Sequence, residues 1–347
     1  MNQDSYKLGI DLALEQFNNS PFAKRNKLQV EVITYAANNK TTSLQNAYEK
    51  AIKDGVVAIM GLPTSQEALS VGQLAVKHKT LTFSFLAANT NIEKYRNYLF
   101  SGALNSNDDT ELTQKHILKH EKLNRVLFIT RNNSLFTSGF INKLIINSKN
   151  KLEAYDLIKL DPLKQLSKEQ LKKLKKSSYD LVALSLYAYQ GVNVLNQLAE
   201  HGIVKQQPVI VSGAWYYDFK PIDLYLKQHS NIYVITSMSM QWIHNNAGRF
   251  ILTFKKEFHQ EPDTNHVIAY DVSNMIVTAI KKSKDYTRKS ILKSFTDHKH
   301  FTGISGPYHY DNCRSHPRKY YFIHKLNKNK VFQIESKGLL AKDEDCY

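Results

Sequence analysis

The sequence lacks several features that define whole classes of protein. It has only two cysteines, Cys313 and Cys346, in 347 residues, too few for a small domain held together by disulfides. Whether these two cysteines pair stays open at the level of sequence. No apolar run approaches the roughly 18 residues of a membrane span, and the first residues lack the basic and then apolar build of a secretion signal.

Motifs of the common enzyme classes are also missing. Residues 61–65 follow a predicted strand, but no Gly-Lys-Ser/Thr completes a phosphate-binding loop, and GxGxxG does not occur. Residues 303–306 read GxSG where a nucleophile elbow needs GxSxG, so we interpret them as a tight turn. The late histidines show none of the ligand spacings of a zinc site. We therefore expect no enzyme, no catalytic residue, no cofactor and no metal.

Acidic residues are scarce beside basic ones, with 31 Asp and Glu against 47 Lys and Arg and a net charge of +16. Such an excess is typical of proteins that bind nucleic acid or anionic surfaces. Here the basic residues are scattered, and the one dense run, residues 164–176, carries leucines at near-helical spacing. That pattern indicates a solvated helix face. Because no nucleic-acid-binding motif accompanies it, we expect no nucleic-acid partner.

Short apolar runs alternate with longer amphipathic segments, which is typical of βαβ units around parallel sheets. The length and a 42% hydrophobic fraction suffice for two cores. The predicted strands cover residues 28–35, 56–60, 81–85, 125–130, 154–160, 181–186, 208–212 and 232–236. The predicted helices cover 5–17, a segment beginning at Thr41 or Thr42, 64–78, 108–121, 136–148, 166–176, 190–201, 246–259, 266–282 and 287–296. A β-hairpin is predicted from 320–326 and 330–334.

Two strand ends carry the positive evidence for a binding site. Thr64 and Ser65 open a helix directly after a buried strand, where hydroxyls and free backbone N–H groups suit an anion such as a carboxylate. Ordinary N-capping is the alternative interpretation. Small and polar residues follow the strand at 81–85 at its carboxyl end, which is where ligands bind in open α/β sheets.

Several short motifs in a common order resemble the branched-chain amino-acid binding proteins of ABC transporters, which are periplasmic binding proteins of type I. The motifs span nearly the whole chain. They are Gly9, Ala13 and Asn18, then 59–65 with Ala68, then Phe83-Ser84 with 87–89, then Phe254, Phe258, Pro262 and 269–271, and finally 301–311.

The resemblance implies an α/β fold of two Rossmann-like lobes with parallel sheets, joined by three hinge crossings and closing on a ligand. We expect lobe 1 to comprise 1–103 plus 237–306, and lobe 2 to comprise 104–236 plus 307–347. The family's first strand, an apolar run before the first helix, has no room here and is apparently missing. Either the protein begins upstream, with a secretion signal and a periplasmic location, or this strand has been lost.

The resemblance also assigns ligand-binding roles. In the first lobe, Ser65, Ala87 and Ala88 would hold the ligand carboxylate, and Thr64 and Asn89 are further ligand-binding candidates. Ala88 stands where the family usually has Thr or Ser, so one hydroxyl contact is lost unless Asn89 or Thr90 substitutes for it.

From the second lobe, Phe136 and Tyr187 would line the cleft. The segment with Ala214 and Trp215 lacks the acidic residue that pairs with a ligand ammonium in the amino-acid binders, and whether Asp218, the nearest acid, reaches the cleft stays open. Because a buried ammonium is costly without a carboxylate, an unmodified amino acid is a less secure ligand, and Trp215 would instead wall the cleft for an apolar or aromatic solute.

The resemblance thus predicts a receptor that captures a small polar ligand, an amino acid or a related carboxylate or amide, and hands it to the membrane permease of an ABC transporter. Two alternatives stay open. One is a ligand-sensing or regulatory module of the same fold without transport. The other is a truncated copy that no longer binds.

Overall fold

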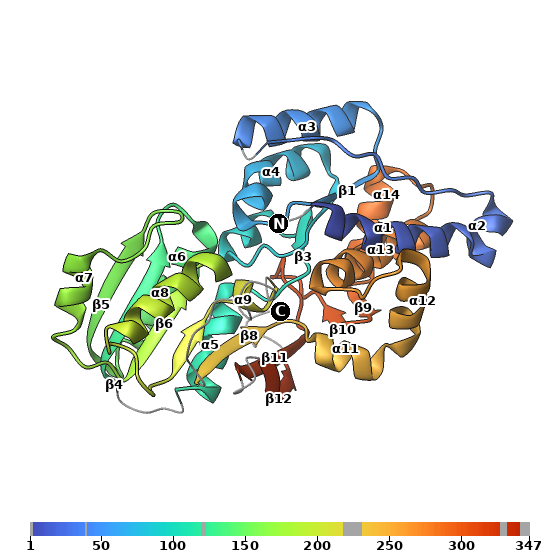
Figure 1. Ribbon diagram of the computed structural model, residues 1–347. Coiled ribbons are helices and arrows are strands. Elements are labelled where there is room, and N and C mark those ends of the chain that lie inside the picture. The colour runs from blue at the N-terminus through green and yellow to red at the C-terminus, as the bar shows by residue number, and fades with distance from the viewer. Residues whose placement is uncertain (1–2, 39, 119–122, 218–230, 327–331, 341–347) are drawn as a thin grey trace. The chain divides into compact units, whose positions relative to one another are not determined.

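The computed structural model describes residues 3–38, 40–118, 123–217, 231–326 and 332–340 (Figure 1). The chain divides into two units. Unit 1 comprises residues 1–105, 238–320 and 339–347, and unit 2 comprises 106–237 and 321–338. The first two crossings lie within two residues of the predicted ones.

The third crossing differs from the prediction, because residues 307–320 group with unit 1 and not with the second lobe. Aromatic side chains bind this segment to unit 1. Tyr310 is buried, and its hydroxyl donates a hydrogen bond to the carbonyl of Ser101 at 2.8 Å. The tail from 339 also returns to unit 1, where the Leu340 N–H donates to the Lys319 carbonyl.

Unit 1 contains a parallel sheet in the order β1-β2-β3, formed by Ala58–Gly61, Leu81–Ser84 and Leu99–Ser101. The register pairs Gly61 with Ser84 and Ser84 with Ser101, so the three carboxyl ends lie level. Helix α4 (Ser65–His78) follows β1, and Thr64 caps it in a capping box with Glu67. The predicted helix start is confirmed.

The helices of unit 1 cover both faces of this sheet. Ile59 of β1 packs with Val71 and Ala75 of α4, while Phe295 of α14 stacks edge-on against Phe83 of β2. Helices α1 and α13 lie side by side (Figure 1). Besides α4, the helices are α1 (Gln3–Asn18), α2 (Pro21–Asn26), α3 (Thr41–Lys53), the 3-10 helix η1 (Thr90–Tyr95), α11 (Met240–Asn246), α12 (Gly248–Phe258), α13 (Thr264–Lys282) and α14 (Arg288–Asp297). Lys40, and not Thr41 or Thr42, occupies the N-cap of α3.

The predicted strand at 28–35 is wrong, because the segment has no regular secondary structure. Val32 and Ile33 are 44% and 56% exposed. Asn18 holds the segment through both polar groups of Val30, donating to its carbonyl at 3.0 Å and accepting its N–H at 2.9 Å. A strand needs a neighbour to complete its ladder, and in the described part of the chain no strand pairs with 28–35.

Unit 2 is built on a seven-stranded sheet in the order β12-β11-β8-β7-β6-β4-β5. Its strands from β4 to β8 pair in parallel, whereas β11 runs antiparallel to β8. The strands are β4 (Leu123–Arg131), β5 (Leu152–Leu160), β6 (Leu181–Ser185), β7 (Val209–Val211), β8 (Ile232–Thr236), β11 (Tyr320–Leu326) and β12 (Phe332–Leu339). The predicted hairpin strands are therefore adjacent, and their connection at 327–329 lies outside the described residues.

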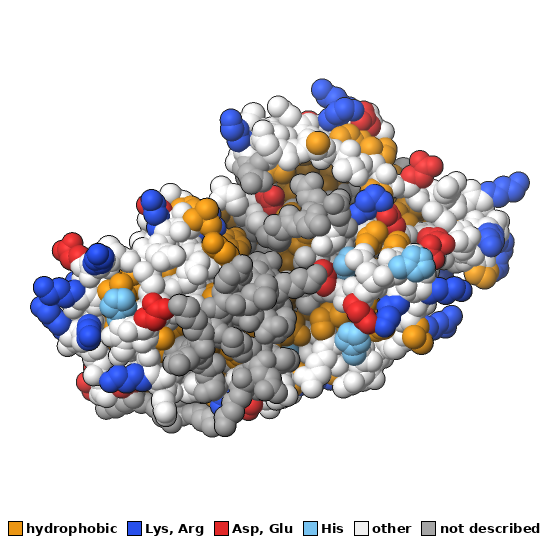
Figure 2. Space-filling model, in the orientation of Figure 1, with side chains coloured by type: hydrophobic (Ala, Val, Ile, Leu, Met, Phe, Trp, Pro, Cys, Tyr) orange, Lys and Arg blue, Asp and Glu red, His pale blue; other side chains and the backbone are white. Residues whose placement is uncertain are grey.

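Alternation along β4 places helices on both faces of this sheet. Leu127 and Ile129 belong to a buried cluster with α7 and α8, whereas Val126 and Phe128 belong to one with α6. The helices of unit 2 are α5 (Ser106–His116), α6 (Leu135–Ser148), α7 (Lys168–Leu174), α8 (Ala188–Glu200) and α9 (Ala214–Tyr217). The basic run contains α7, whose Lys172 and Lys173 are exposed, which confirms the predicted solvated face, while Leu171 and Leu174 are buried. Basic side chains are spread among acidic ones over the face shown in Figure 2.

The motif segments at 269–271 and 301–311 meet in unit 1. The Asp271 carboxylate accepts hydrogen bonds from the N–H groups of Ile304 and Ser305 and from the hydroxyls of Ser305 and Tyr308, at 2.6 to 3.1 Å. A Cβ at Gly303 would lie 2.5 Å from the Asp271 Cγ, so only glycine fits. Residues 303–306 form the turn between β9 (His300–Gly303) and β10 (Gly306–His309), as predicted.

Candidate functional site

The loop after β2 lies against the start of α4 in unit 1. The Ser65 Oγ accepts hydrogen bonds from the N–H groups of Ala88 at 3.1 Å and Asn89 at 3.2 Å. The sheet register makes this possible, since β1 and β2 end level with each other. The structure therefore brings together four of the residues that the sequence singled out: Ser65, Ala87, Ala88 and Asn89.

The same loop is held by polar groups from other strand ends. Ser84 accepts the Ala87 N–H at 3.0 Å, and Ser101 donates its hydroxyl to the Ala87 carbonyl at 2.7 Å. The buried ring of His316 also contacts this carbonyl through Nε2 at 3.0 Å, while its Nδ1 faces Glu93. Although burial raises the pKa of Glu93, the hydrogen bond with His316 holds it below its ordinary value. The loop is thus held at Ala87 by side chains from three other segments.

Several polar side chains at the carboxyl end of this sheet already form hydrogen bonds within the protein. Thr64 accepts the Glu67 N–H and donates its hydroxyl to the Glu67 carboxylate at 2.8 Å. Asn89 caps η1 by accepting the Asn91 N–H at 2.9 Å. Ser65 differs from Thr64, because a hydroxyl that accepts two bonds still has one hydrogen to donate. Among the described residues, no acceptor of that hydrogen is found.

Aromatic residues of unit 2 gather at the carboxyl ends of β4 and β6. Tyr187, the N-cap residue of α8, lies 6.3 Å from Phe136 between ring centroids. The Arg131 guanidinium at the end of β4 lies 5.1 Å from the Tyr187 ring, within cation–π range. Both predicted aromatics are only partly buried. The two rings and the Arg131 guanidinium together form a surface with apolar faces and one cationic edge.

Trp215 does not line an accessible surface. Its side chain is 0% exposed, its Nε1 donates to the Leu186 carbonyl at 3.2 Å, and it packs against Gly191 of α8. This is a correction to the expected wall of a cleft. A short helix after β7 turns the indole inward, where it belongs to the core beneath α8. Ala214 is 8% exposed, and Asp218 lies outside the described residues.

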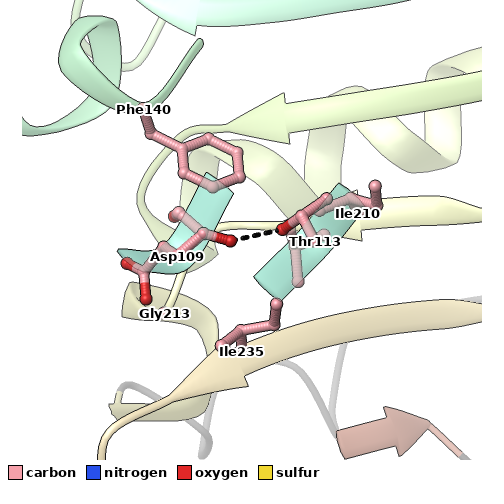
Figure 3. Close-up of a pocket in the computed structure, with 8 residues that line it drawn as sticks. Asp109, Thr113, Phe140, Ile210, Gly213 and Ile235 are labelled. Atoms are coloured by element: carbon pink, nitrogen blue, oxygen red, sulfur yellow. Dashed lines mark hydrogen bonds between the residues drawn. The ribbon is translucent and has the colours of Figure 1, made fainter. Parts of the chain in front are cut away.

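Asp109, a partly buried acid beside the strand ends of unit 2, was not singled out from the sequence. Asp109 of α5 lines a pocket in unit 2 together with Ser212 and Gly213, which follow β7 (Figure 3). Burial and the neighbouring Asp108 raise the pKa of its carboxyl well above the ordinary value. The adjacent acids at 108 and 109 were visible in sequence, but nothing local links them to residues a hundred positions away.

Metal sites, membrane-spanning helices and disulfides were also sought among the described residues. Among them, no group of three or more His, Cys, Asp or Glu residues is arranged to hold a metal ion. A helix with the length and apolarity to cross a bilayer is likewise not found in the described segments. Cys313 is disulfide-bonded, and Cys346, the other cysteine of the sequence, lies outside the described residues.

A family model described as periplasmic binding protein matches residues 1–330. The chain belongs to the periplasmic binding protein family. The match extends through both units and includes the Ser65 loop, the aromatic pair and Asp109. A comparison with curated proteins gave no match.

Solved periplasmic binding proteins share the fold of this family member at low sequence identity. The substrate-binding protein LivJ of Streptococcus pneumoniae, in complex with isoleucine, is 18% identical with a TM-score of 0.76, covering 97% of this chain and 94% of its own. An amino acid ABC transporter substrate-binding protein of Pseudomonas fluorescens Pf-5 is 15% identical with a TM-score of 0.79, covering 98% and 92%. A solute-binding protein of Rhodopseudomonas palustris BisB5, in complex with 3,4-dihydroxybenzoic acid, is 18% identical with a TM-score of 0.74, covering 98% and 94%.

Proposed function

We propose that this protein is the solute-binding receptor of an ABC transporter and binds a small polar ligand that carries a carboxylate. The observation that carries the proposal is the arrangement at Ser65. Its hydroxyl, placed at a helix start, holds the loop that follows the next strand and keeps one hydrogen to donate. A carboxylate at this point would accept that hydrogen and lie in the positive field of the α4 N-terminus.

The relatives support the same ligand class. The solved complexes named above contain isoleucine and 3,4-dihydroxybenzoic acid. Both molecules carry a carboxylate, on an aliphatic body in isoleucine and on a dihydroxylated aromatic ring in the other. Taken by itself, unit 2 presents the partly buried rings of Tyr187 and Phe136, which suit apolar or aromatic groups.

The proposal includes a location and a partner. Family membership suggests the periplasm, and the disulfide at Cys313 supports it, because disulfides persist in oxidising compartments. The partner would be a membrane permease that receives the ligand. The role proposed is binding and delivery, without catalysis.

A thermal-shift screen tests the proposal with amino acids, their amides and aromatic acids. A true ligand at 100 times its dissociation constant adds about 2.7 kcal/mol to the free energy of unfolding. We expect at least one carboxylate to raise the melting temperature by several degrees. The methyl ester of the same compound is the matched control and should give no shift. The proposal is wrong if no carboxylate shifts the transition, or if acid and ester shift it equally.

A further inference from the structure

The sheet of unit 2 ends in a long strand with one open side. Strand β5 has nine residues and pairs with β4, and in the described part of the chain no other strand pairs with it. It forms the outer edge of this sheet (Figure 1). Its sequence contains no proline. Such an edge presents a row of backbone N–H and C=O groups, which natural proteins protect or cover with another strand.

The exposed side chains of β5 carry both apolar surface and charge. One face of the strand carries Glu153, Tyr155, Leu157 and Lys159, which alternate with less exposed residues. Tyr155 and Leu157 are 47% and 37% exposed, although both side chains are large and mainly apolar. The edge therefore presents two apolar residues with an acid on one side and a base on the other.

This order of side chains is complementary to itself. If β5 meets a second β5 in the antiparallel direction about a two-fold axis at Asp156, Glu153 lies opposite Lys159 of the second copy. Tyr155 then lies opposite Leu157, and the symmetry makes each of these pairs occur twice. Opposite charges and aromatic–aliphatic pairs on facing strands stabilise a sheet. The strand thus matches its own copy in charge and in apolar contacts.

The backbone of β5 fits the same register. The Lys151 carbonyl accepts the Leu123 N–H of β4 at 2.8 Å. Because the backbone groups of successive residues point to opposite sides of a strand, those of Ala154, Asp156 and Ile158 point to the open edge. A two-fold axis at Asp156 places these three residues opposite one another, so their N–H and C=O groups can form a ladder.

Charge favours this register over its neighbours. An axis one residue earlier in the strand would place Lys151 opposite Lys159, and an axis one residue later would place Glu153 opposite Asp161. Like charges at facing positions destabilise a sheet. Of these three registers, the one with its axis at Asp156 is therefore expected to be the most stable.

Asp156 meets its own copy at the axis, where two carboxylates would repel each other. In each chain, however, the Arg125 guanidinium donates a hydrogen bond to the Asp156 carboxylate at 2.9 Å. The Tyr179 hydroxyl donates to the same carboxylate at 2.9 Å, and the Asp156 side chain is only 19% exposed. The counter-charge within each chain removes most of the repulsion.

We propose that β5 is a dimerisation edge, at which two copies of this chain join their unit 2 sheets into one continuous sheet. The partner is a second copy because β5 is complementary to itself in sequence and in backbone register. One pair of edge strands buries a small area, so the dimer is expected to be weak and to depend on protein concentration.

Sedimentation equilibrium of the full chain measures this association. The mean mass should rise from 39.9 kDa toward twice that value as the concentration increases from roughly 1 to 500 µM. Hydrogen exchange followed by mass spectrometry locates the contact. The amides of residues 154, 156 and 158 should exchange more slowly at high protein concentration than at low concentration.

Charge reversal tests the register. Lys159→Glu would place two acids opposite each other at both symmetric positions, and Glu153→Lys would place two bases there, so each should weaken the dimer at least about tenfold. The double variant with both substitutions restores opposite charges and should dissociate within about threefold of the parent. Lys256→Glu reverses an exposed base on α12 of unit 1, so it controls for net charge and should leave the association unchanged.

Three results would overturn the proposal. They are a mass of one chain up to about 500 µM, a dimer that neither single reversal weakens, and a double variant that stays as weak as the single variants. All the substituted positions are exposed, so the variants should keep the circular dichroism spectrum of the parent. None of these outcomes depends on a ligand, so the proposed function is tested separately.

Discussion

Replacing Ser65 with alanine removes an oxygen that accepts the N–H groups of Ala88 at 3.1 Å and Asn89 at 3.2 Å. Ser65 is only 2% exposed, so water does not readily replace the lost acceptor. At about 1 kcal/mol for each hydrogen bond, the substitution should lower the free energy of unfolding of unit 1 by about 2 kcal/mol. For a unit of about 200 residues this corresponds to roughly 4–8 °C in melting temperature.

Thermal unfolding followed by far-ultraviolet circular dichroism measures this change, and Ser70→Ala is the matched control. Ser70 lies on the same helix, but its hydroxyl donates only to the Glu67 carbonyl within that helix. We expect Ser70→Ala to stay within about 0.5 kcal/mol of the parent. In the presence of ligand, Ser65→Ala should lose a further 1–2 kcal/mol or so of binding free energy, because the hydroxyl hydrogen is gone.

The reasoning fails if Ser65→Ala and Ser70→Ala melt at the same temperature as the parent, since the loop would then not depend on the hydroxyl. It fails in part if stability falls while affinity for the carboxylate ligand is unchanged. That outcome would make Ser65 a purely structural residue.

Two further predictions concern buried groups. Gly191→Ala should lower the free energy of unfolding of unit 2 by about 1–3 kcal/mol in urea denaturation, because the added Cβ would lie 2.3 Å from the Trp215 Cζ2. Gly248→Ala is the control. No atom lies within 4 Å of the Cβ position at Gly248, so this substitution should change stability little. Burial lowers the pKa of Lys319 from the ordinary 10.5 to about 7, although the negative charge of Asp271 acts in the opposite direction. Between pH 7 and pH 10.5 the unfolded chain therefore binds more protons at this residue than the folded chain does. The free energy of unfolding should therefore rise with pH by up to about 1.4 kcal/mol per pH unit, and denaturation of Lys319→Met should lack this slope; an equal slope in parent and variant would assign it to other groups.

Much of the architecture could be predicted because it depends on local patterns. The strand at 232–236 and the helix start at Ser65 follow from short apolar runs and an N-cap residue, and the structure has both where expected. The segment 28–35 has an equally good strand pattern and is not a strand. The difference is the partner, because a ladder needs a second strand whose position no local pattern encodes.

In the candidate site, too, some residues could be predicted from the sequence and others could not. Ser65 and the residues after β2 were recognisable because they lie at strand ends, and level registers in a parallel sheet bring such ends together. Trp215 looked equally suited to a ligand by composition alone. Its burial depends on the direction in which α9 leaves β7 and on a glycine at 191 that makes room for the indole.

The sequence by itself determined the βαβ rhythm, the helix caps and the order of motifs that marks the family, since all of these are properties of neighbouring residues. Only the tertiary structure decided which polar groups meet. Asp109 reaches the pocket beyond β7, and Asp271 meets the turn at 303–306, across more than 30 residues of chain in each case. Such contacts depend on how helices pack against a sheet, and packing is set by the whole set of buried side chains and not by any one segment.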